Sequence, residues 1–521
     1  MSSEMKFHRP VVMGTRGMVS TGHPLASSAA LDVLKTGGNA VDAALSASAV
    51  LSVVKSYHGG LGGDLFGIFY SAKERKISVL NGSGRSPRLL RRERYSGAIP
   101  ERGILAACTP GTVDAWVEAA ARLGSRSLGD LLAPAVEYAG SGFPVFPHLH
   151  SVIQSSQKTL AADPAWAKVF LPEGEAPKIG DLLVQKDLAR TLAAIARGGR
   201  DAFYAGEVAG LMARASERHG GFFSAEDFAE HRSRWEEPLS TAYRGYEICA
   251  PPPNSYGLLL LLQLKILSDH GIGAYAQGSP EYVALQVRAQ EQAWRAGEKW
   301  IADPDWHRRD DLIDFLKTFP GGAQGSRPPA GAGKPGNDTT YIATADESGN
   351  WASLIQSVHQ SFGCGIVVEG TGIVLNNRMS GFNLAPGHPN ELAPAKLPAH
   401  TLSPALVLKA QTPVLAIGTP GGLGQTQFLA QTLGNIFDFH MNLQAAIEAP
   451  RWQSEGPGRV ELESRFPGEV GALLAAAGYD VKVRGPWEFA FGGVEAVGLH
   501  ENGRVFMGAA DPRRDGYAMG Y

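Results

Sequence analysis

"GKPGNDTTYIATADESGNW", residues 333–351, joins a tract rich in glycine and proline to an alternating pattern typical of a β-strand. Half of residues 321–338 are glycine or proline, which predicts a flexible surface segment or linker. After the tract, "TTYIATA" alternates, "DESGN" is a turn and "WASLIQSVH" alternates again, so residues 339–359 are predicted to form a β-hairpin. A chain can be cut at such a junction without disrupting a core, because the upstream residues make few obligatory contacts.

The first residue of the predicted strand is Thr339, which follows Asp338. By itself, a threonine pair at a strand start reflects β-propensity. Cleavage between Asp338 and Thr339 would give Thr339 a free α-amine beside its own hydroxyl. The ordinary pKa of an α-amine is about 7.7 to 8.0, so part of it is neutral near pH 7 and acts as a general base. Thr339 would then hold nucleophile and base in one residue.

Helix and strand patterns alternate along the rest of the chain. Residues 23–54 predict two helices separated by a Gly-Gly stop, and residues 59–84 predict a glycine-rich turn with two strands. Residues 105–245 are predicted to be mostly helical, and a rigid turn precedes an apolar helix that ends at Leu267. Two strands and two helices follow residue 400. The mixture predicts a large sheet covered by helices, with both halves of the chain contributing strands.

A series of short motifs runs along nearly the whole chain. In order, they are "HPLASSAALDVLKTGGNAVDAA", "GGLGGDLF", "CTPGTVDAW", "LLAPAVEYAGSGFPV", "PPPNSYG", "NDTTYIATADESGN", "SFGCGIVVEGTGIVLNNRM", "LSPALV", "GTPGG", "EAPRW" and "DPRRDGYAMGY". In these motifs, their order and their spacing, the chain resembles the γ-glutamyltransferases, a family of self-cleaving N-terminal-nucleophile hydrolases. A lone "TPGG" would be weak evidence, whereas the ordered set is specific.

The resemblance implies a fold of the α/β (α+β) class, a four-layer αββα sandwich made from one precursor. It implies that Thr339 attacks the carbonyl of Asp338, and that the resulting ester hydrolyses to a large chain, 1–338, and a small chain, 339–521, in one joint structural domain. Thr339 then attacks a substrate amide and forms an acyl-enzyme, which water or an amine resolves. No cofactor is implied, and a dimer of processed units is a further expectation.

Two other places match catalytic positions of the family. Ser357 stands where the family has a second hydroxyl residue that hydrogen-bonds the nucleophile; the alternative is an ordinary serine of the hairpin. In "GTPGG", residues 418–422, two glycines let backbone N–H groups approach an oxyanion, although a plain strand-to-helix turn also explains the pattern. The resemblance favours the oxyanion role for Gly421 and Gly422. A phosphate loop is not favoured, because no Lys-Ser/Thr pair follows.

Several positions that bind the glutamyl group in typical members are changed. The carboxylate-binding arginine aligns on Ser83, and Arg85 nearby is the candidate replacement. Arg378 stands where members with glutamyl specificity usually carry an acidic or amide residue, and Gly381 stands where they carry an aspartate for the substrate ammonium. The same block, "LNNRMSGF", adds Asn377 to the predicted substrate-binding residues.

Two histidines and a threonine complete the predicted substrate site. His359 replaces the usual asparagine of the hairpin, and His400 with Thr401 replaces a usual serine pair. The alternative interpretation of each histidine is a structural residue satisfied in the core. An arginine fork pairs with a carboxylate and repels a cation, so the changes predict a substrate with a carboxylate near the scissile amide and no ammonium. In this combination the chain resembles the shorter branch of the family that includes oxamate amidohydrolase.

These observations leave three functions open. The leading hypothesis is a self-processing threonine amidohydrolase acting on a small, carboxylate-bearing amide. The second is a true γ-glutamyltransferase or glutathione hydrolase with a rearranged pocket. The third is an inactive relative that only binds ligand or partners.

Composition argues against several other classes. With 521 residues, 44% hydrophobic and 19% charged, the chain is of ordinary globular composition. A formal net charge of −3 with no long basic block argues against nucleic-acid binding. Cys108, Cys249 and Cys364 form no close pair, which argues against a disulfide framework and a cysteine-rich zinc site. His58 and Asp64 have no third ligand at regular spacing, so no metal site is predicted; the glycines around them suit a tightly packed turn.

Neither a signal peptide nor a membrane span is predicted. The N-terminus, "MSSEMKFHRPVVMGTRG", has no apolar run of sufficient length. The longest apolar run, residues 257–267, is interrupted by Gln263 and Lys265 and is shorter than the roughly 20 residues of a membrane helix. We therefore expect a soluble, cytoplasmic protein with no membrane partner.

Overall fold

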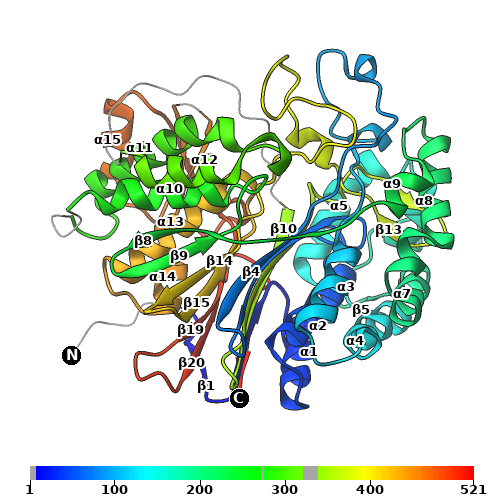
Figure 1. Ribbon diagram of the computed structural model, residues 1–521, viewed down its shortest axis with the longest axis horizontal. Helices are drawn as coiled ribbons and strands as arrows, with labels where there is room; N and C mark the ends of the chain where they lie inside the picture. Colours follow the sequence, from blue (N-terminus) through cyan, green and yellow to red (C-terminus); the bar gives the residue numbers. More distant parts are fainter. Residues whose placement is uncertain (1–7, 272–274, 321–337, 457) are drawn as a thin grey trace.

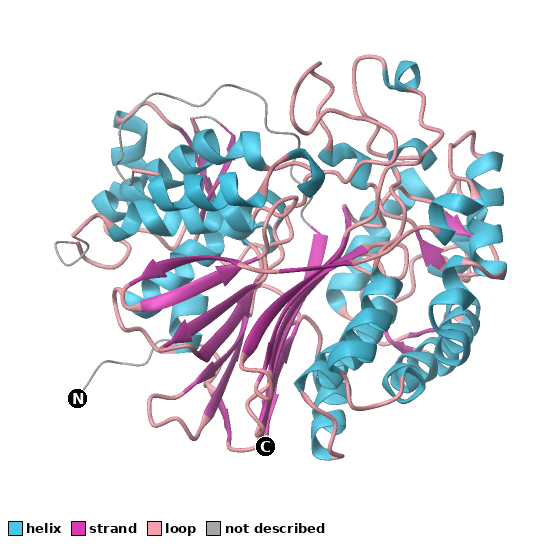
Figure 2. Cartoon of the chain, viewed as in Figure 1, coloured by secondary structure: helices cyan, strands magenta, loops and turns pink. Residues whose placement is uncertain are grey.

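The computed structural model describes residues 8–271, 275–320, 338–456 and 458–521. Two antiparallel seven-stranded sheets pack face to face, and helices cover both outer faces (Figures 1 and 2). This arrangement confirms the expected four-layer αββα sandwich. As the sequence pattern predicts, segments from both halves of the chain contribute strands to each sheet.

One sheet, called here the hairpin sheet, contains the strand that begins at the predicted cleavage site. Its strands run in the order β21 (Tyr517–Gly520), β2 (Gly17–Thr21), β10 (Asp338–Asp346), β11 (Trp351–His359), β3 (Asp64–Ser71), β4 (Lys76–Gly82) and β7 (Arg234–Glu236). The central hairpin β10–β11 therefore pairs on each side with strands from the N-terminal part of the chain.

The second sheet faces the hairpin sheet across an apolar layer. Its strands run in the order β1 (Val12–Gly14), β20 (Phe506–Ala510), β19 (Glu495–Leu499), β15 (Thr412–Gly418), β14 (Ala405–Lys409), β9 (Tyr246–Ala250) and β8 (Leu239–Tyr243). Phe66, Tyr341 and Ile355 of the hairpin sheet pack with Leu406 and Val497 of the second sheet. The two sheets thus bury one face of each against the other.

Helices close the sandwich on both sides (Figure 1). The hairpin sheet is covered mainly by α1 (Pro24–Lys35), α2 (Ala40–Val54), α3 (Thr112–Leu123), α4 (Leu128–Ser141) and α7 (Lys186–Tyr204). The second sheet is covered mainly by α10 (Gly257–Ser268), α11 (Pro280–Gly297), α13 (Gln425–Phe437) and α14 (Leu443–Glu448).

Six further α-helices and three small sheets complete the α-helices and β-strands of the described residues. The helices are α5 (Pro147–Leu160), α6 (Pro164–Phe170), α8 (Glu207–Arg218), α9 (Ala225–Ala229), α12 (Arg309–Thr318) and α15 (Gly468–Ala476). The small sheets are β5 (Phe143–Pro144) with β6 (Leu182–Leu183), β12 (Val367–Val368) with β13 (Ile373–Val374), and β16 (Trp452–Gly456) with β17 (Arg459–Glu463) and β18 (Asp480–Arg484).

Helix α2 shows why the alanine-rich sequence folds as it does. All fifteen of its residues are buried, and its small side chains let it lie close to the hairpin sheet. Asn39 and Asp42 form a capping box at its start, after the Gly37–Gly38 break that ends α1. The two-helix prediction for residues 23–54 is therefore confirmed.

The predicted hairpin is confirmed, with Asp346 accepting a hydrogen bond from the Asn350 N–H across the turn. The predicted linker needs one correction: Asp338 is the first residue of β10, whereas residues 321–337 lie outside the described residues. The helical prediction for residues 105–245 is wrong at its end. Strands β7 and β8 occupy that end and flank Pro238 at the edges of the two sheets, where proline is tolerated.

Candidate active site

A bulge interrupts the β10–β11 ladder at the predicted cleavage site. Asp338 pairs with His359 and Thr340 with Gln356, so β11 has one extra residue opposite Thr339. His359 absorbs the irregularity with a φ of 81°, which is uncommon for a residue with a side chain. The regular ladder therefore resumes only after Thr339, the residue whose hydroxyl the chemistry requires.

Thr339, Ser357 and the carbonyl of Asp338 are linked by one buried chain of hydrogen bonds. Oγ1 of Thr339 donates to Oγ of Ser357 over 3.2 Å, and Oγ of Ser357 donates to the carbonyl oxygen of Asp338 over 2.7 Å. The backbone N–H of His359 donates to the same Ser357 oxygen over 2.8 Å. The predicted nucleophile, the second hydroxyl and the carbonyl to be attacked are therefore adjacent.

The glycine-rich loop before β3 packs against this strand pair. A Cβ at Gly63 would lie 2.3 Å from the carbonyl oxygen of Ser357, a distance that no side chain tolerates. The same loop carries His58, whose Nε2 lies 2.9 Å from Oδ1 of Asp338. The other carboxylate oxygen of Asp338 accepts a hydrogen bond from Ser361.

Gly421 and Gly422 have the backbone freedom that the oxyanion prediction requires. Their φ angles are 128° and 55°, and a Cβ at Gly421 would lie 2.6 Å from the Phe428 ring. In the described part of the chain, neither N–H donates to another residue. The next residue, Leu423, lines the pocket described below. The oxyanion role remains a prediction.

A pocket of about 260 Å³ collects part of the predicted substrate set. Arg378, His359, Thr401 and Gly381 line it. Its apolar lining is Tyr256, Trp294, Ile301, Phe382, Leu384, Ala399 and Leu423. Sequence reasoning did not identify this apolar wall, because α11 and the loops that supply it are far apart in the chain.

Arg378 has a partner that the sequence did not reveal. Its Nε donates to Oδ2 of Asp64 over 3.1 Å, and both side chains are buried. Nη2 of Arg378 is also buried and makes no hydrogen bond to the residues that the structure describes. Burial raises the pKa of Asp64 to about 6, while Arg378 and the Gly84 N–H oppose the rise. Asp64 thus holds the Nε side of the guanidinium, and Nη2 is left without a partner among the described residues.

Glu298 is a second residue that the sequence did not identify. It lies directly after α11 and lines the same pocket as Arg378. The pocket therefore has a carboxylate in its lining in addition to the arginine. No spacing rule connects Glu298 to Arg378, since the two come from different elements.

The two histidines occupy different places. His359 lines the pocket, and its Nδ1 lies 3.1 Å from Oγ of Ser380; burial, with Arg378, lowers its pKa to about 3. His400 is not part of the pocket lining; its Nε2 lies 3.6 Å from Oδ2 of Asp64, and its ring lies 5.1 Å from that of Phe66. Burial, with Arg378 and His359, lowers its pKa well below the ordinary value. Both imidazoles are therefore neutral near pH 7.

Asn377 and Arg85 lie outside the pocket lining. Asn377 accepts from the Gln360 N–H and donates to the Glu101 carbonyl, so it fixes local backbone. Arg85 pairs with Asp303 at 2.9 Å and Asp305 at 3.3 Å and lines a separate cavity of about 520 Å³. The polar atoms of both residues are engaged in these contacts, so we propose no substrate-binding role for them.

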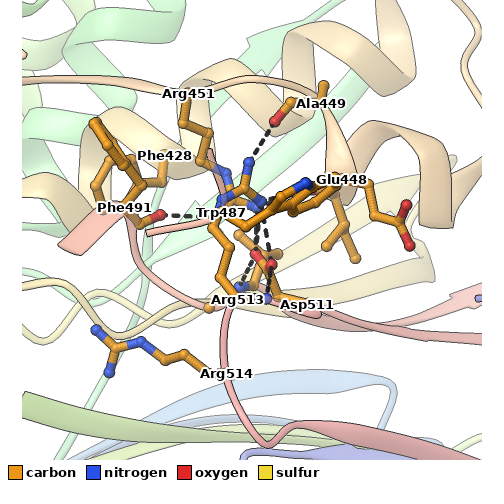
Figure 3. A network of polar contacts seen from close by, with 12 residues as sticks. Phe428, Glu448, Ala449, Arg451, Trp487, Phe491, Asp511, Arg513 and Arg514 are labelled. Carbon is orange, nitrogen blue, oxygen red and sulfur yellow. Dashed lines mark hydrogen bonds and ion pairs between the residues drawn. The ribbon is translucent and has the colours of Figure 1, made fainter. Parts of the chain in front are cut away.

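A buried charge network holds the C-terminal loop behind the site (Figure 3). Arg451 lies 2.6 Å from Asp511, and Arg513 contacts both Asp511 at 3.1 Å and Glu463 at 2.7 Å. The next residue, Arg514, lies over the Phe489 ring. The "DPRRDGY" motif thus has a structural role, which is to fix the loop that approaches Asp338.

The family model for gamma-glutamyltranspeptidase matches residues 26–521. The chain belongs to the gamma-glutamyltranspeptidase family. It is 38% identical to the glutathione hydrolase-like YwrD proenzyme of Bacillus subtilis (strain 168), over 98% of this chain and 99% of that protein. It is 35% identical to the oxamate amidohydrolase proenzyme of Klebsiella pneumoniae, over 98% and 99% of the two chains.

A solved structure of the family agrees with the fold. The cephalosporin acylase from Bacillus halodurans superimposes with a TM-score of 0.91 and 34% identity, covering 100% of this chain and 98% of the acylase. The family match, the two relatives and this solved structure together show that the chain is an enzyme of the N-terminal-nucleophile hydrolase type.

In the described residues, no group of three or more His, Cys, Asp or Glu side chains is arranged to hold a metal ion. No helix among them has the length and hydropathy needed to cross a membrane.

Proposed function

We propose that the chain is a self-processing threonine amidohydrolase in which Thr339 is the nucleophile for both self-cleavage and turnover. The observation that carries the proposal is the hydrogen-bond chain from Thr339 through Ser357 to the Asp338 carbonyl. The proenzyme names of the relatives support the processing step.

In self-cleavage, Oγ1 of Thr339 attacks the carbonyl carbon of Asp338. The Oγ1 proton moves to Ser357 while Ser357 passes its own hydroxyl proton to the oxygen of the Asp338 carbonyl, so Ser357 ends as a neutral hydroxyl and the proton on the former carbonyl oxygen is available for the leaving nitrogen. The peptide C–N bond then breaks, its nitrogen takes up a proton, and an ester joins Asp338 to Thr339. Water hydrolyses the ester, which releases the Asp338 carboxylate and leaves Thr339 with a free hydroxyl and a free α-amine.

In turnover, the α-amine of Thr339 removes the proton from Oγ1 as the oxygen attacks the substrate amide. The N–H groups of Gly421 and Gly422 are the proposed donors to the oxyanion. The leaving amine takes the proton, and an acyl ester remains on Thr339. Water then attacks the ester and releases the acid.

The proposed substrate is a small amide with a carboxylate, of the oxamate kind. The unpaired Nη2 of Arg378 supports this proposal, since it is a buried donor at a pocket wall. His359 and Thr401 add neutral polar groups to the same wall. The similarity to an oxamate amidohydrolase also supports it.

A second candidate substrate is a γ-glutamyl amide. Glu298 favours it, because a carboxylate in the pocket can accept the α-ammonium while Arg378 binds the α-carboxylate. The glutathione hydrolase-like relative points the same way. An inactive binding protein is the least favoured function, since the Thr339–Ser357 contact would then have no use.

The processing proposal is tested by incubating the purified full chain. Wild-type protein is expected to give two fragments, with Thr339 at the start of the smaller one by mass spectrometry. Thr339→Ala should remain one chain, and Thr339→Ser should be cut because it keeps the hydroxyl. A wild-type chain that stays intact after long incubation would disprove self-cleavage at this bond.

The substrate proposal is tested by comparing oxamate and dicarboxylic acid monoamides with a γ-glutamyl anilide. We expect higher kcat/KM for the former group. Glu298→Gln should leave that value unchanged or raise it, since it removes a negative charge near an anionic substrate. Faster turnover of the γ-glutamyl anilide, with a loss of roughly tenfold or more in Glu298→Gln, would instead assign the γ-glutamyl function.

A further inference from the structure

The carboxylate of Asp338 is held by side chains from two other segments of the chain. Oδ1 lies 2.9 Å from Nε2 of His58, and the other oxygen accepts from the Ser361 hydroxyl. His58 comes from the loop after α2, and Ser361 from the turn after β11. Two segments far apart in the sequence therefore grip the carboxylate of the residue whose carbonyl is to be attacked.

The same residue is held at its carbonyl end by Ser357, which donates over 2.7 Å. A side chain fixed at one end and a carbonyl fixed at the other leave little freedom for rotation about the Cα–C bond of Asp338. That rotation sets the angle at which Oγ1 of Thr339 meets the carbonyl carbon. Holding it fixed favours attack, because reactivity falls steeply when reacting atoms are misplaced.

We propose that His58 is a positioning residue for self-cleavage, which fixes the Asp338 carboxylate and so orients the scissile carbonyl toward Thr339. This inference rests on the proposed function. His58 acts on the precursor: once the bond is cut, Asp338 belongs to the new end of the large chain and its carbonyl no longer has to meet Thr339. The step itself is the ester formation and hydrolysis of the proposed self-cleavage, in which water is the only other reactant.

An alternative role for the Asp338 carboxylate, as general base for Thr339, fits the contacts less well. Both of its oxygens already have partners. Burial by itself raises the pKa of Asp338, but His58, Ser361 and Arg514 outweigh burial and hold the pKa below the ordinary value. Burial lowers the pKa of His58 to about 4, although the Asp338 carboxylate opposes the shift, and the ring lies 2.9 Å from that carboxylate.

The surroundings of His58 allow a discriminating pair of variants. Its ring is fully buried among Tyr57, His148 and Phe489, with centroid distances of 4.1, 5.7 and 5.7 Å. His58→Phe keeps an aromatic ring in this cluster but removes the donor. His58→Gln loses the ring but places an amide N–H at a similar distance from the backbone. A packing role predicts that phenylalanine is tolerated better, whereas a positioning role predicts that glutamine is.

The experiment follows the appearance of the two fragments from freshly purified full-length chains by gel and intact mass. We expect His58→Phe to be cut about 10 to 100 times more slowly than wild type and His58→Gln within about threefold of it. The amount of cleaved His58→Phe is measured, and its kcat is calculated per cleaved molecule. Relative to wild type, this kcat should change far less than the rate of self-cleavage. The same substitutions in a Thr339→Ala background report folding, by thermal unfolding of a chain that is never cut.

Each other outcome is informative. The inference is overturned if His58→Phe is cut as fast as wild type, if it is cut faster than His58→Gln, or if both are slowed equally. If His58→Phe does not fold, Asp338→Asn and Ser361→Ala test the same grip from the other side, and normal cutting of both overturns it. An uncut wild-type chain would be a failure of the proposed function instead, which is thereby distinguished from a failure of this inference.

Discussion

Ser357 is placed to act in self-cleavage through a single hydroxyl group. It accepts from Thr339, donates to the carbonyl of Asp338, and is itself oriented by the His359 N–H. A serine in this position can pass a proton and stabilise an oxyanion, whereas an alanine can do neither. The irregular β11 backbone around His359 is what brings the hydroxyl to this point, since a regular ladder would pair Thr339 directly.

We therefore expect Ser357→Ala to slow self-cleavage about 100-fold, the usual cost of losing one oxyanion donor. Ser357→Thr keeps the hydroxyl and should be cut at a rate close to that of wild type. The measurement is a time course of fragment appearance at constant pH. Cutting of Ser357→Ala at the wild-type rate would show that another group supplies the proton path.

At the scale of elements, the loop between β15 and α13 is the proposed oxyanion site of turnover. Gly421 adopts a φ of 128°, and a Cβ there would meet the Phe428 ring at 2.6 Å, so any side chain must displace the loop. The proposed self-cleavage uses Ser357 as oxyanion donor, while proposed turnover uses this loop. The two reactions should therefore respond differently when the loop is disturbed.

Gly421→Ala is expected to lower kcat for the amide substrate by about 100-fold while the rate of self-cleavage stays near that of wild type. Gly503→Ala is the matched control: Gly503 also has a positive φ, of 68°, but no atom lies within 4 Å of its added Cβ. Gly503→Ala should lower the free energy of unfolding by about 1 kcal/mol and leave kcat unchanged. Equal losses of both rates in Gly421→Ala would contradict this division of roles.

The elements also explain what the sequence could predict. The β10–β11 hairpin and the α1–α2 pair follow from local patterns, namely alternation, a polar turn and a glycine stop, so residues 23–54 and 339–359 were predictable. The edge strands β7 and β8 were not predictable, because such short alternating stretches become strands only by pairing with the edge of a sheet. The surroundings of Arg378 were hidden for the same reason: Asp64 contacts it, and Glu298 lines the same pocket, through tertiary packing that no local spacing records.

At the scale of the whole molecule, the proposed cleavage site lies inside a sheet to which residues before and after Thr339 both contribute strands. β10 pairs with β2 and β11 pairs with β3, so the bond between Asp338 and Thr339 can break while the ladders on both sides persist. Behind the sheets, the C-terminal loop is fixed by Arg451 and Arg513 around Asp511 (Figure 3). The architecture therefore depends on buried charges of the C-terminal loop as well as on the sheets.

This network makes a prediction about acid stability. Burial alone raises the pKa of Asp511, but Arg451 and Arg513 outweigh it and hold the pKa below the ordinary value. A carboxyl group whose folded-state pKa is depressed stabilises the fold fully above its unfolded pKa of about 3.9 and loses that contribution as pH falls through the folded value. Wild-type stability should therefore decrease below about pH 4.

Asp511→Asn should reduce the free energy of unfolding by about 3 to 5 kcal/mol at pH 7, because it leaves two buried guanidinium groups without their shared partner. It should also weaken the acid dependence, since the titrating group is gone. Urea unfolding in a Thr339→Ala background measures both on a single uncut chain. Asp480→Asn is the control, because Asp480 pairs with Arg459 at 4.0 Å with both side chains largely exposed and should cost less than about 1 kcal/mol. Equal destabilisation by the two substitutions would mean that the buried network does not hold the C-terminal loop.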